Sequence, residues 1–213
     1  MFLAPITSNA HAEGLTKFES AMEDWNVCKE ACRSSFDINL SSASTFYEKY
    51  LEHKHLRTSK EVIATPEVLL AEAVCIKEID LLTATLDDVK QVHHNFTLDI
   101  SNAGRDRPLN SFLGWFDFRF DGSPYNPSLV EVLCSTGPSI NDWTHWGQDA
   151  FLVDQPELLE NGDKIEGNIT VTRAKHDWRM YDVTIEHTCC HIDAASGKEV
   201  RRGATSRIKH QLE

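Results

Sequence analysis

Hydrophobic positions follow two different periods along this chain, and the period changes near Val68. Before that point, apolar residues recur every three or four positions, which is the spacing of one face of an α-helix. The residues of this predicted face are Leu15, Phe18, Met22, Trp25 and then Cys28 or Ala31. A second, shorter helix is predicted around Phe46, Tyr47, Tyr50 and Leu51. Residues 2–6 read as a short strand, and its proline indicates a sheet edge.

After Val68 the apolar residues alternate with polar ones, as they do in half-buried β-strands. The clearest predicted strand is Gly114–Phe120, which would place Phe116, Phe118 and Phe120 on one face. Further strands are predicted at Val130–Leu133, Phe151–Val153, Ile169–Thr172 and Tyr181–Ile185, with a turn at Asn161-Gly162. Many short strands separated by Gly, Pro, Asn and Asp predict a barrel or a sandwich.

Composition and charge narrow the class of partner. The chain has 213 residues, 41% hydrophobic and 25% charged, with a net charge of -12. This acidic balance argues against nucleic-acid binding, which usually needs a basic face. It would instead attract basic partners such as arginine-rich tails. No apolar stretch is long enough to span a bilayer, so no membrane partner is expected.

The first residues do not resemble a secretory signal. Met1–Ala12 has no basic region, and Pro5 interrupts its short apolar run. Six cysteines in a chain of this length are too sparse for a disulfide scaffold. We therefore expect a reducing compartment, the cytoplasm or the nucleus.

Several familiar chemical motifs are missing from the sequence. It contains no G-x-G-x-x-G or P-loop cradle for a nucleotide, no G-x-S-x-G elbow and no H-E-x-x-H pair. The cluster His187–His191 has a composition that suits zinc. On a strand, however, Cys189 and Cys190 would face opposite ways, and no second Cys or His pair lies nearby. No metal site is expected.

The most informative segment is a loop that follows a predicted strand. It runs from Ser135-Thr136-Gly137-Pro138 to Thr144-His145-Trp146-Gly147-Gln148. A His and a Trp on one loop indicate binding, because loops carry function and Trp forms a rigid wall. The local pattern leaves an alternative open, in which the tryptophan plugs the mouth of a barrel and the histidine caps it.

This loop resembles the Ser-Thr-x-Pro and Thr-His-Trp loop of protein arginine methyltransferases. Similar segments follow in the family's order along nearly the whole chain. They are Met1–Ile6, Phe36–Leu40, Gly114–Phe118, Gly162–Gly167 and Tyr181–Ile185. Gly147 departs from the pattern, since Lys or Tyr is usual there, and the arm region lacks the family's Trp-rich run.

The resemblance implies an all-β fold, an antiparallel β-barrel with an inserted helical arm near the N-terminus. It divides the chain into a first barrel strand at 1–6, a dimerisation-arm-like insertion at 7–60 and a substrate-binding barrel at 61–213. It also implies a complete enzyme that uses S-adenosylmethionine and methylates arginine in basic proteins. The cofactor half is expected to be missing here, so this chain alone should bind no cofactor and be inactive.

The same resemblance assigns roles to three residues. Thr144 would fix the loop, and His145, the catalytic candidate, would pair with a carboxylate across the domain interface. Trp146 would offer its face to the guanidinium. The Thr-His-Trp loop favours the type I enzymes, which make asymmetric products, and the arm implies a homo- or hetero-oligomer. Two alternatives stand: a non-catalytic regulatory partner of a full-length enzyme, and an unrelated β-sandwich binding module.

Overall fold

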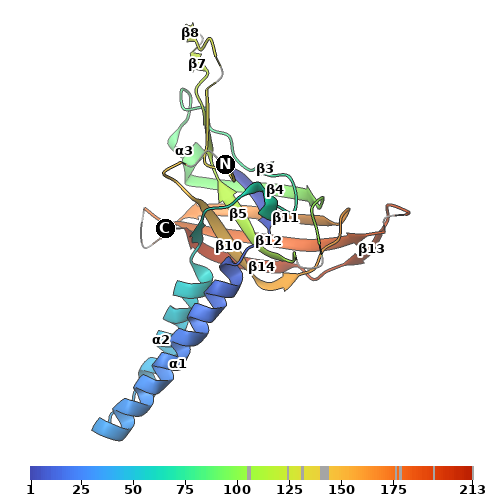
Figure 1. The fold of residues 1–213 in the computed structure, drawn as a ribbon. Coiled ribbons are helices and arrows are strands. Elements are labelled where there is room, and N and C mark those ends of the chain that lie inside the picture. Colours follow the sequence, from blue (N-terminus) through green and yellow to red (C-terminus); the bar gives the residue numbers. More distant parts are fainter. Residues whose placement is uncertain are drawn as a thin grey trace.

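The described residues form two antiparallel five-stranded sheets, two small two-stranded ribbons and a helical pair (Figure 1). The first sheet contains β1 (Phe2–Ile6), β2 (Lys60–Val62), β3 (Val74–Cys75), β5 (Leu109–Trp115) and β10 (Gln148–Glu157). The second contains β4 (Gln91–Asp99), β11 (Lys164–Arg173), β12 (Tyr181–Ile192), β13 (Glu199–Arg202) and β14 (Ser206–Leu212). This computed structural model describes residues 1–104, 107–123, 125–130, 132–139, 144–175, 177, 179–193 and 195–212.

The expected mainly β architecture is confirmed, but the expected closed barrel is not. The first sheet has the order β2-β10-β5-β1-β3, and the second has β13-β12-β11-β4 with β14 also on β12. Among the described residues neither sheet closes on itself, and one isolated bridge, Thr58 to Gln211, joins the two. Where β14 faces β10, the buried imidazole of His210 donates its Nε2–H to the Leu152 carbonyl at 2.8 Å. A side chain thus occupies a backbone acceptor that further sheet pairing would use.

The core lies between the two sheets and follows directly from the alternation in the sequence. Ile165 and Ile169 on β11, and Val183 and Ile185 on β12, point inward and are almost fully buried. They meet Phe112 of β5, which has no exposed surface. The inward face of each strand therefore supplies one continuous apolar layer, as the period of two requires.

The helical pair extends away from the sheets (Figure 1). It comprises α1 (Ala10–Phe36), α2 (Ser41–Glu52) and a π-helical turn, η1 (His53–Arg57). Asp37 ends α1 in the left-handed conformation, with φ of 54°. Between the helices, the Trp25 ring lies 4.6 Å from the Tyr47 ring, and its indole N–H donates to Ser44 Oγ at 3.2 Å. The two predicted helices are confirmed.

The shorter helices are η2 (Pro66–Val68) and α3 (Leu86–Lys90). No helix of the described residues combines the length and the apolar character that crossing a membrane requires.

The clearest predicted strand, Gly114–Phe120, is wrong as a single element. β5 ends at Trp115, and after a break at Phe116 the chain continues as β6 (Asp117–Arg119). Phe118 and Phe120 are exposed, so their alternation does not mark a core face. β6 pairs with β9 (Leu133–Ser135), and further along the chain β7 (Gly122–Ser123) pairs with β8 (Asn126–Pro127). These two ribbons form a hairpin that projects from the sheets (Figure 1). The strand predicted at Val130–Leu133 is correspondingly displaced to β9.

The strand predicted at residues 2–6 is confirmed as β1, but it does not lie at an edge. It pairs with β5 on one side and with β3 on the other. Because β3 pairs only with Phe2 and Leu3, Pro5 lies beyond the end of that ladder. The proline is therefore tolerated without an edge position.

Candidate functional site

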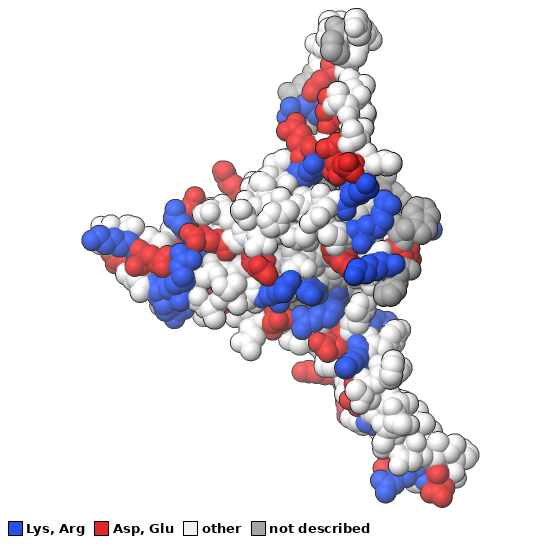
Figure 2. Space-filling view, turned by 180° about the vertical axis from the view of Figure 1, so that it is seen from behind, with Lys and Arg blue, Asp and Glu red and all other residues white. Residues whose placement is uncertain are grey.

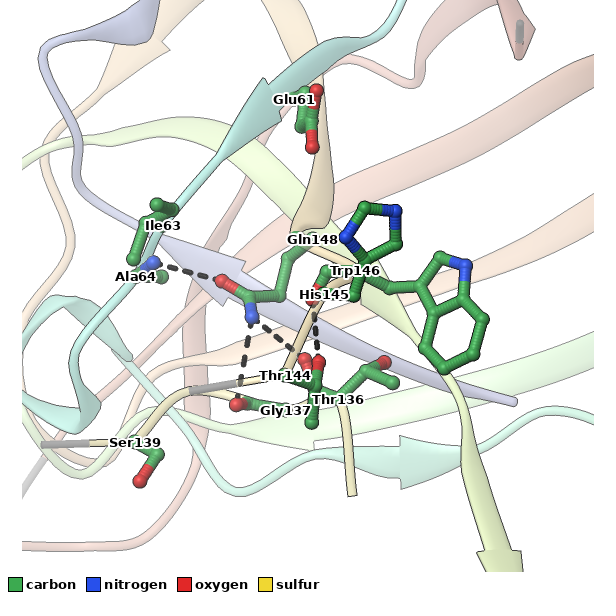
Figure 3. A pocket seen from close by; sticks show the side chains of 11 residues that line it. Glu61, Ile63, Ala64, Thr136, Gly137, Ser139, Thr144, His145, Trp146 and Gln148 are labelled. Carbon is green, nitrogen blue, oxygen red and sulfur yellow. Dashed lines mark hydrogen bonds between the residues drawn. The ribbon is translucent and has the colours of Figure 1, made fainter. Parts of the chain in front are cut away.

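A small cavity of about 60 Å³ lies beneath the loop that joins β9 to β10. The candidate residues Thr144, His145 and Trp146 all line it (Figure 3). Trp143, on the same loop, lies outside the described residues. The other lining residues come from β2 and the residues after it, from the loop after β9 and from the start of β10: Glu61, Ile63, Ala64, Thr136, Gly137, Ser139, Gly147 and Gln148.

Gln148 ties the three segments of the cavity together. It is buried, and its Oε1 accepts a hydrogen bond from the backbone N–H of Ala64 at 2.7 Å. Its Nε2 donates to the carbonyls of Thr136 at 2.6 Å and Gly137 at 3.5 Å (Figure 3). The Gln148 amide thus pairs with backbone groups of both the segment after β2 and the segment after β9. Leaving such buried groups unpaired would lower stability.

The root of the loop is fixed a second time by Thr136. Its hydroxyl donates to the carbonyl of Phe116 at 2.8 Å and accepts from the N–H of Phe116 at 3.2 Å. A Cβ on Gly137 would lie 2.7 Å from Trp115 Nε1, so any side chain here would force the indole or the loop to shift. The loop therefore begins from a rigid base.

The tip of the loop is exposed. Thr144 Oγ1 donates to the Trp146 carbonyl at 2.7 Å, which closes a tight local turn. The Trp146 ring packs edge-on against Phe116 at 5.9 Å and against His145 at 5.9 Å, yet the residue remains 54% exposed. This exposure argues against a tryptophan that plugs a barrel mouth.

One carboxylate, that of Glu61, lines the cavity together with this tip, and a second lies across the ladder from it. Glu61 on β2 is directly opposite Asp149 on β10. Burial raises the pKa of Asp149, the neighbouring Glu61 charge raises it further, and a hydrogen bond from Ser59 opposes the rise. A Cβ on Gly147 would lie 3.0 Å from Glu61 Cγ and 3.0 Å from the Val62 carbonyl, so the glycine allows β2 to pack closely here.

The structure thus brings Thr144, His145 and Trp146 to one cavity and adds residues to which the sequence assigned no role. Gln148 ends the Thr-His-Trp segment of the sequence. A glutamine at the start of a strand does not by itself indicate which backbone groups its side chain will bond. Glu61 lies 84 positions before His145 in the chain, and only the pairing of β2 with β10 brings it near. No signal in a single sequence predicts that pairing.

The cluster His187–His191 lies on β12, an interior strand of the second sheet, and contributes partly to the core. Cys189 is buried, and desolvation raises the pKa of its thiol strongly. His191 Nδ1 lies 2.8 Å from Asp163 Oδ2, and His191 Nε2 lies 2.8 Å from a nitrogen of Arg201. Within the described ranges, no group of three His, Cys, Asp or Glu side chains is arranged to hold a metal ion.

Comparison with known sequences places the chain in a family. Residues 8–191 match the family described as the arginine methyltransferase oligomerization subdomain. Protein arginine N-methyltransferase PRMT10 of Oryza sativa subsp. japonica is 34% identical over 201 residues, which cover 94% of this chain and 51% of the relative. PRMT10 of Arabidopsis thaliana is 29% identical over 197 residues, covering 92% and 50%. The chain therefore spans about half the length of these relatives.

Solved structures agree on the fold. The crystal structure of Arabidopsis thaliana protein arginine methyltransferase 10, described as uniquely open, superposes with a TM-score of 0.89 at 24% identity. It covers all of this chain, which corresponds to 58% of that structure. The Trypanosoma brucei PRMT1 enzyme–prozyme complex gives 0.63 at 12% identity, covering 100% of this chain and 55% of that one. These two likenesses concern the fold alone. The match over residues 8–191 and the 34% identity to rice PRMT10 show that the chain belongs to the protein arginine methyltransferase family and carries its C-terminal oligomerization subdomain.

Proposed function

We propose that this chain is the substrate-side and dimerisation part of an S-adenosylmethionine-dependent arginine methyltransferase. Its parts would be a first strand at 1–6, an arm at 7–60 and a substrate-binding body at 61–213. Basic, arginine-containing proteins in the cytoplasm or nucleus would be its substrates. The single observation that carries this proposal is the exposed Trp146 face held above a rigid, buried hydrogen-bond clamp.

The arrangement suits a guanidinium, which is planar, charged and delocalised. An arginine side chain can stack on an indole face and be held there by cation–π attraction. Thr144 keeps the turn closed through its bond to the Trp146 carbonyl, and Gln148 keeps the base in place. His145, beside the indole ring, would pair with a carboxylate brought by the cofactor-binding part. The pocket would then exclude water when the two parts meet.

The described residues do not fit S-adenosylmethionine itself. A nucleotide cradle needs a glycine-rich turn between a strand and the start of a helix. Here β1 passes into α1 through Thr7, Ser8 and Asn9, and the first glycine, Gly14, already lies inside the helix. We propose that the cofactor binds to the part of the family's longer chains that this sequence does not match.

The arm is proposed as the oligomerisation element. Its outer surface carries large exposed apolar side chains, namely Val27, Phe36, Ile38, Phe46, Tyr47 and Tyr50. Apolar surface of this extent marks an interaction site in a folded protein. The family description as an oligomerization subdomain supports the same role.

The test of the substrate role is a paired measurement on Trp146→Ala. The cofactor-binding half of rice PRMT10 is fused ahead of this chain, and methyl transfer to an arginine-rich peptide is measured. We expect activity to fall by an order of magnitude or more, because the indole face is lost. Thermal unfolding of the unfused chain should change little, since exposed substitutions stay within roughly 0.5 kcal/mol.

The two measurements separate a binding role from a structural one. Unfolding of the unfused variant would make Trp146 a structural residue. Unchanged activity together with unchanged stability would remove the loop from the substrate site altogether. Phe118→Ala serves as a control, because Phe118 is also exposed but lies on the projecting hairpin.

A second candidate function is that of a non-catalytic partner of a full-length enzyme. The observation that favours it is the likeness in fold to a protein from a complex of an enzyme with a prozyme. Mixing this chain with an intact family member would distinguish the two. A change in that enzyme's activity without any fusion supports a regulatory role.

A further inference from the structure

A second and larger cavity lies at the opposite end of β10 from the Thr144–Gly147 loop. Its volume is about 1150 Å³, and it lies between the turn after β10, the loop after β4 and the edge strand β13. Gln148, the first residue of β10, lines the small cavity, whereas Leu158, which follows the last residue of β10, lines the large one. A strand of this length spans roughly 30 Å, so the two cavities are separate sites.

The polar wall of the large cavity is built on a buried carboxylate. Asp163 is only 2% exposed, and its Oδ1 accepts a hydrogen bond from the N–H of Ile192 at 2.9 Å. Its Oδ2 accepts from the N–H of Glu160 at 2.9 Å and lies 2.8 Å from His191 Nδ1. These contacts satisfy the buried carboxylate, and they fix the orientation of the His191 ring.

Arg201 extends this chain of contacts to the cavity. One of its terminal nitrogens lies 2.8 Å from His191 Nε2, on the other side of the ring from Asp163. A guanidinium can only donate, so His191 Nε2 is the acceptor and Nδ1–H donates to Asp163. Glu157 Oε1 lies 3.7 Å from the same Nε2, which is beyond hydrogen-bond range. Asp163 and His191 therefore hold the Arg201 guanidinium in place through one of its N–H groups.

The Arg201 guanidinium is held in place, yet it has no acidic partner. Among the ion pairs formed by the described residues, none includes Arg201. Its neighbour Arg202, by contrast, pairs with Glu166 and Glu199. Figure 2 shows basic and acidic side chains intermixed at the end of the molecule that carries β13. Arg201 is an exception there, and most of its N–H donors remain for a ligand.

Exposed hydrocarbon lines the same cavity. Leu158, from the turn after β10, is 61% exposed, and Val200, from β13, is 68% exposed. Concave surfaces that combine apolar walls with a few fixed polar groups are typical of sites for small molecules. The cavity therefore suits a ligand that has an apolar body and one anionic group.

We propose that the large cavity binds a small carboxylic acid with an apolar body, with Arg201 as its anchor. The carboxylate accepts two parallel N–H bonds from the guanidinium, in a geometry that matches the two planar groups. The hydrocarbon part packs against Leu158 and Val200, where it is removed from water. His191 and Asp163 do not touch the ligand, and they position the guanidinium.

The acids of the lining restrict the charge of the ligand. Asp163 is engaged by His191, and Asp193 Oδ1 accepts from the N–H and the hydroxyl of Ser196 at 2.7 and 2.5 Å. Glu160 also lines the cavity, and none of the ion pairs of the described residues includes it. Arg201 thus lies among several carboxylates. A single negative charge is favoured over the double charge of a phosphate, because these carboxylates repel the phosphate more strongly.

The test measures binding to the chain itself by NMR, through the backbone amide signals of Gly104 and Ile192, which line the large cavity. The Gly147 amide reports on the small cavity. The probes are 4-methylpentanoate, its uncharged amide 4-methylpentanamide, and 3-methylbutyl phosphate. We expect 4-methylpentanoate to shift the signals of Gly104 and Ile192 but not that of Gly147. It should bind about tenfold or more tightly than the amide, because only the acid forms charge-assisted hydrogen bonds, and more tightly than the phosphate.

Two exposed side chains are then changed. Arg201→Gln should weaken the binding of 4-methylpentanoate about tenfold or more, since the anchor is lost. Leu158→Ser should weaken it about threefold, as expected when roughly one methylene loses its apolar contact. The matched control is Arg173→Gln, which removes the same charge from an exposed position at the far end of β11, and it should leave binding unchanged.

The outcomes are decisive for this site and independent of the proposed function, because the two cavities share no residue. Equal binding of the acid and the amide overturns the proposal, as does an Arg201→Gln chain that binds like the unmodified one. Tighter binding of the phosphate overturns the assignment to a carboxylic acid. Shifts confined to Gly147, or no shift at millimolar probe, show that the large cavity does not bind this class of ligand.

Discussion

The two-sheet body and the helical arm use the same kinds of side chain in opposite ways. In the body, Phe112 and Ile185 have no exposed surface. In the arm, Phe36 is 71% exposed and Phe46 is 85% exposed. The body buries its apolar face between two layers of its own chain, whereas the arm buries only the seam between its two helices.

This difference separates buried residues that stabilise the fold from exposed residues that are available to bind a partner. Burial of a large apolar side chain stabilises a fold by about 1.5–3 kcal/mol. An exposed phenylalanine contributes little of that to its own chain. The arm therefore leaves apolar surface available for a partner. Substitutions in the body should change the free energy of unfolding, and substitutions on the exposed face of the arm should change association.

The largest expected effect on stability is that of Phe112→Ala in the body. It removes a fully buried ring from between the sheets, where it contacts Phe96 and His187 edge-on or tilted. Such truncations cost about 3–5 kcal/mol of unfolding free energy. Urea unfolding followed by circular dichroism measures the loss. A cost below about 1 kcal/mol would show that the layer between the sheets is loosely packed.

The next effect is a loss of stability in acid, which arises from His210 in the body. Burial lowers the pKa of His210 from 6.5 to about 4 in the folded chain. Between these values the unfolded chain binds a proton that the folded chain does not, so stability is full above pH 6.5 and falls toward pH 4. The shift corresponds to roughly 3 kcal/mol at most.

Comparison with His210→Gln isolates this contribution from the titration of carboxylates. Glutamine can still donate to the Leu152 carbonyl, but it does not titrate in this range. The stability difference between pH 7 and pH 4.5 should therefore be smaller in the variant. An identical pH dependence in both proteins would rule out His210 as its source. Burial also lowers the pKa of His55 in the arm, helped by Lys54, Lys60 and Lys17, and burial lowers the pKa of His187 in the body. Both add to the loss of stability in acid with the same sign, and the comparison with His210→Gln removes only the contribution of His210.

A smaller effect is expected at the boundary between body and loop, from Gln148→Leu. This change leaves the Ala64 N–H and the Thr136 carbonyl without their partner. Unsatisfied buried groups cost about 1–3 kcal/mol. Hydrogen exchange of the Ala64 amide should accelerate along with the loss of stability. An unchanged exchange rate would mean that the amide has found another acceptor.

The contrast between the regions also explains how far the sequence alone could lead. The alternation at Ile169–Thr172 and Tyr181–Ile185 predicted β11 and β12 because both strands are buried on one face only. The same reasoning failed at Phe118 and Phe120, since alternation reports one apolar face without saying whether anything covers it. The barrel was expected from the family resemblance, yet among the described residues only the isolated bridge between Thr58 and Gln211 joins the two sheets.

The candidate site divides in the same way. Thr144, His145 and Trp146 are adjacent in the chain, so a local motif found them. Gln148 and Glu61 are brought to one cavity by the pairing of β2 with β10, and more than 80 residues separate these strands in the chain. Contacts of that range depend on the whole topology, and a single sequence without variation among relatives contains no signal of them.

The smallest expected effect on stability, and the sharpest test of the comparison, comes from Phe46→Ser in the arm. Because Phe46 is 85% exposed, its loss should change the free energy of unfolding by no more than about 0.5 kcal/mol. We expect the unmodified chain to associate only weakly, because the arm's proposed partner surface belongs to the part of the family that this chain does not match. Light scattering over a range of concentrations should show that weak association, and the substitution should reduce it.

Trp25→Ser is the opposite control: Trp25 packs on Tyr47 and bonds to Ser44, so its loss should loosen the helical pair and lower stability. A discrete dimer that persists after Phe46→Ser would place the interface elsewhere. A large loss of stability in Phe46→Ser would show that the arm, like the body, uses its aromatic residues for its own fold.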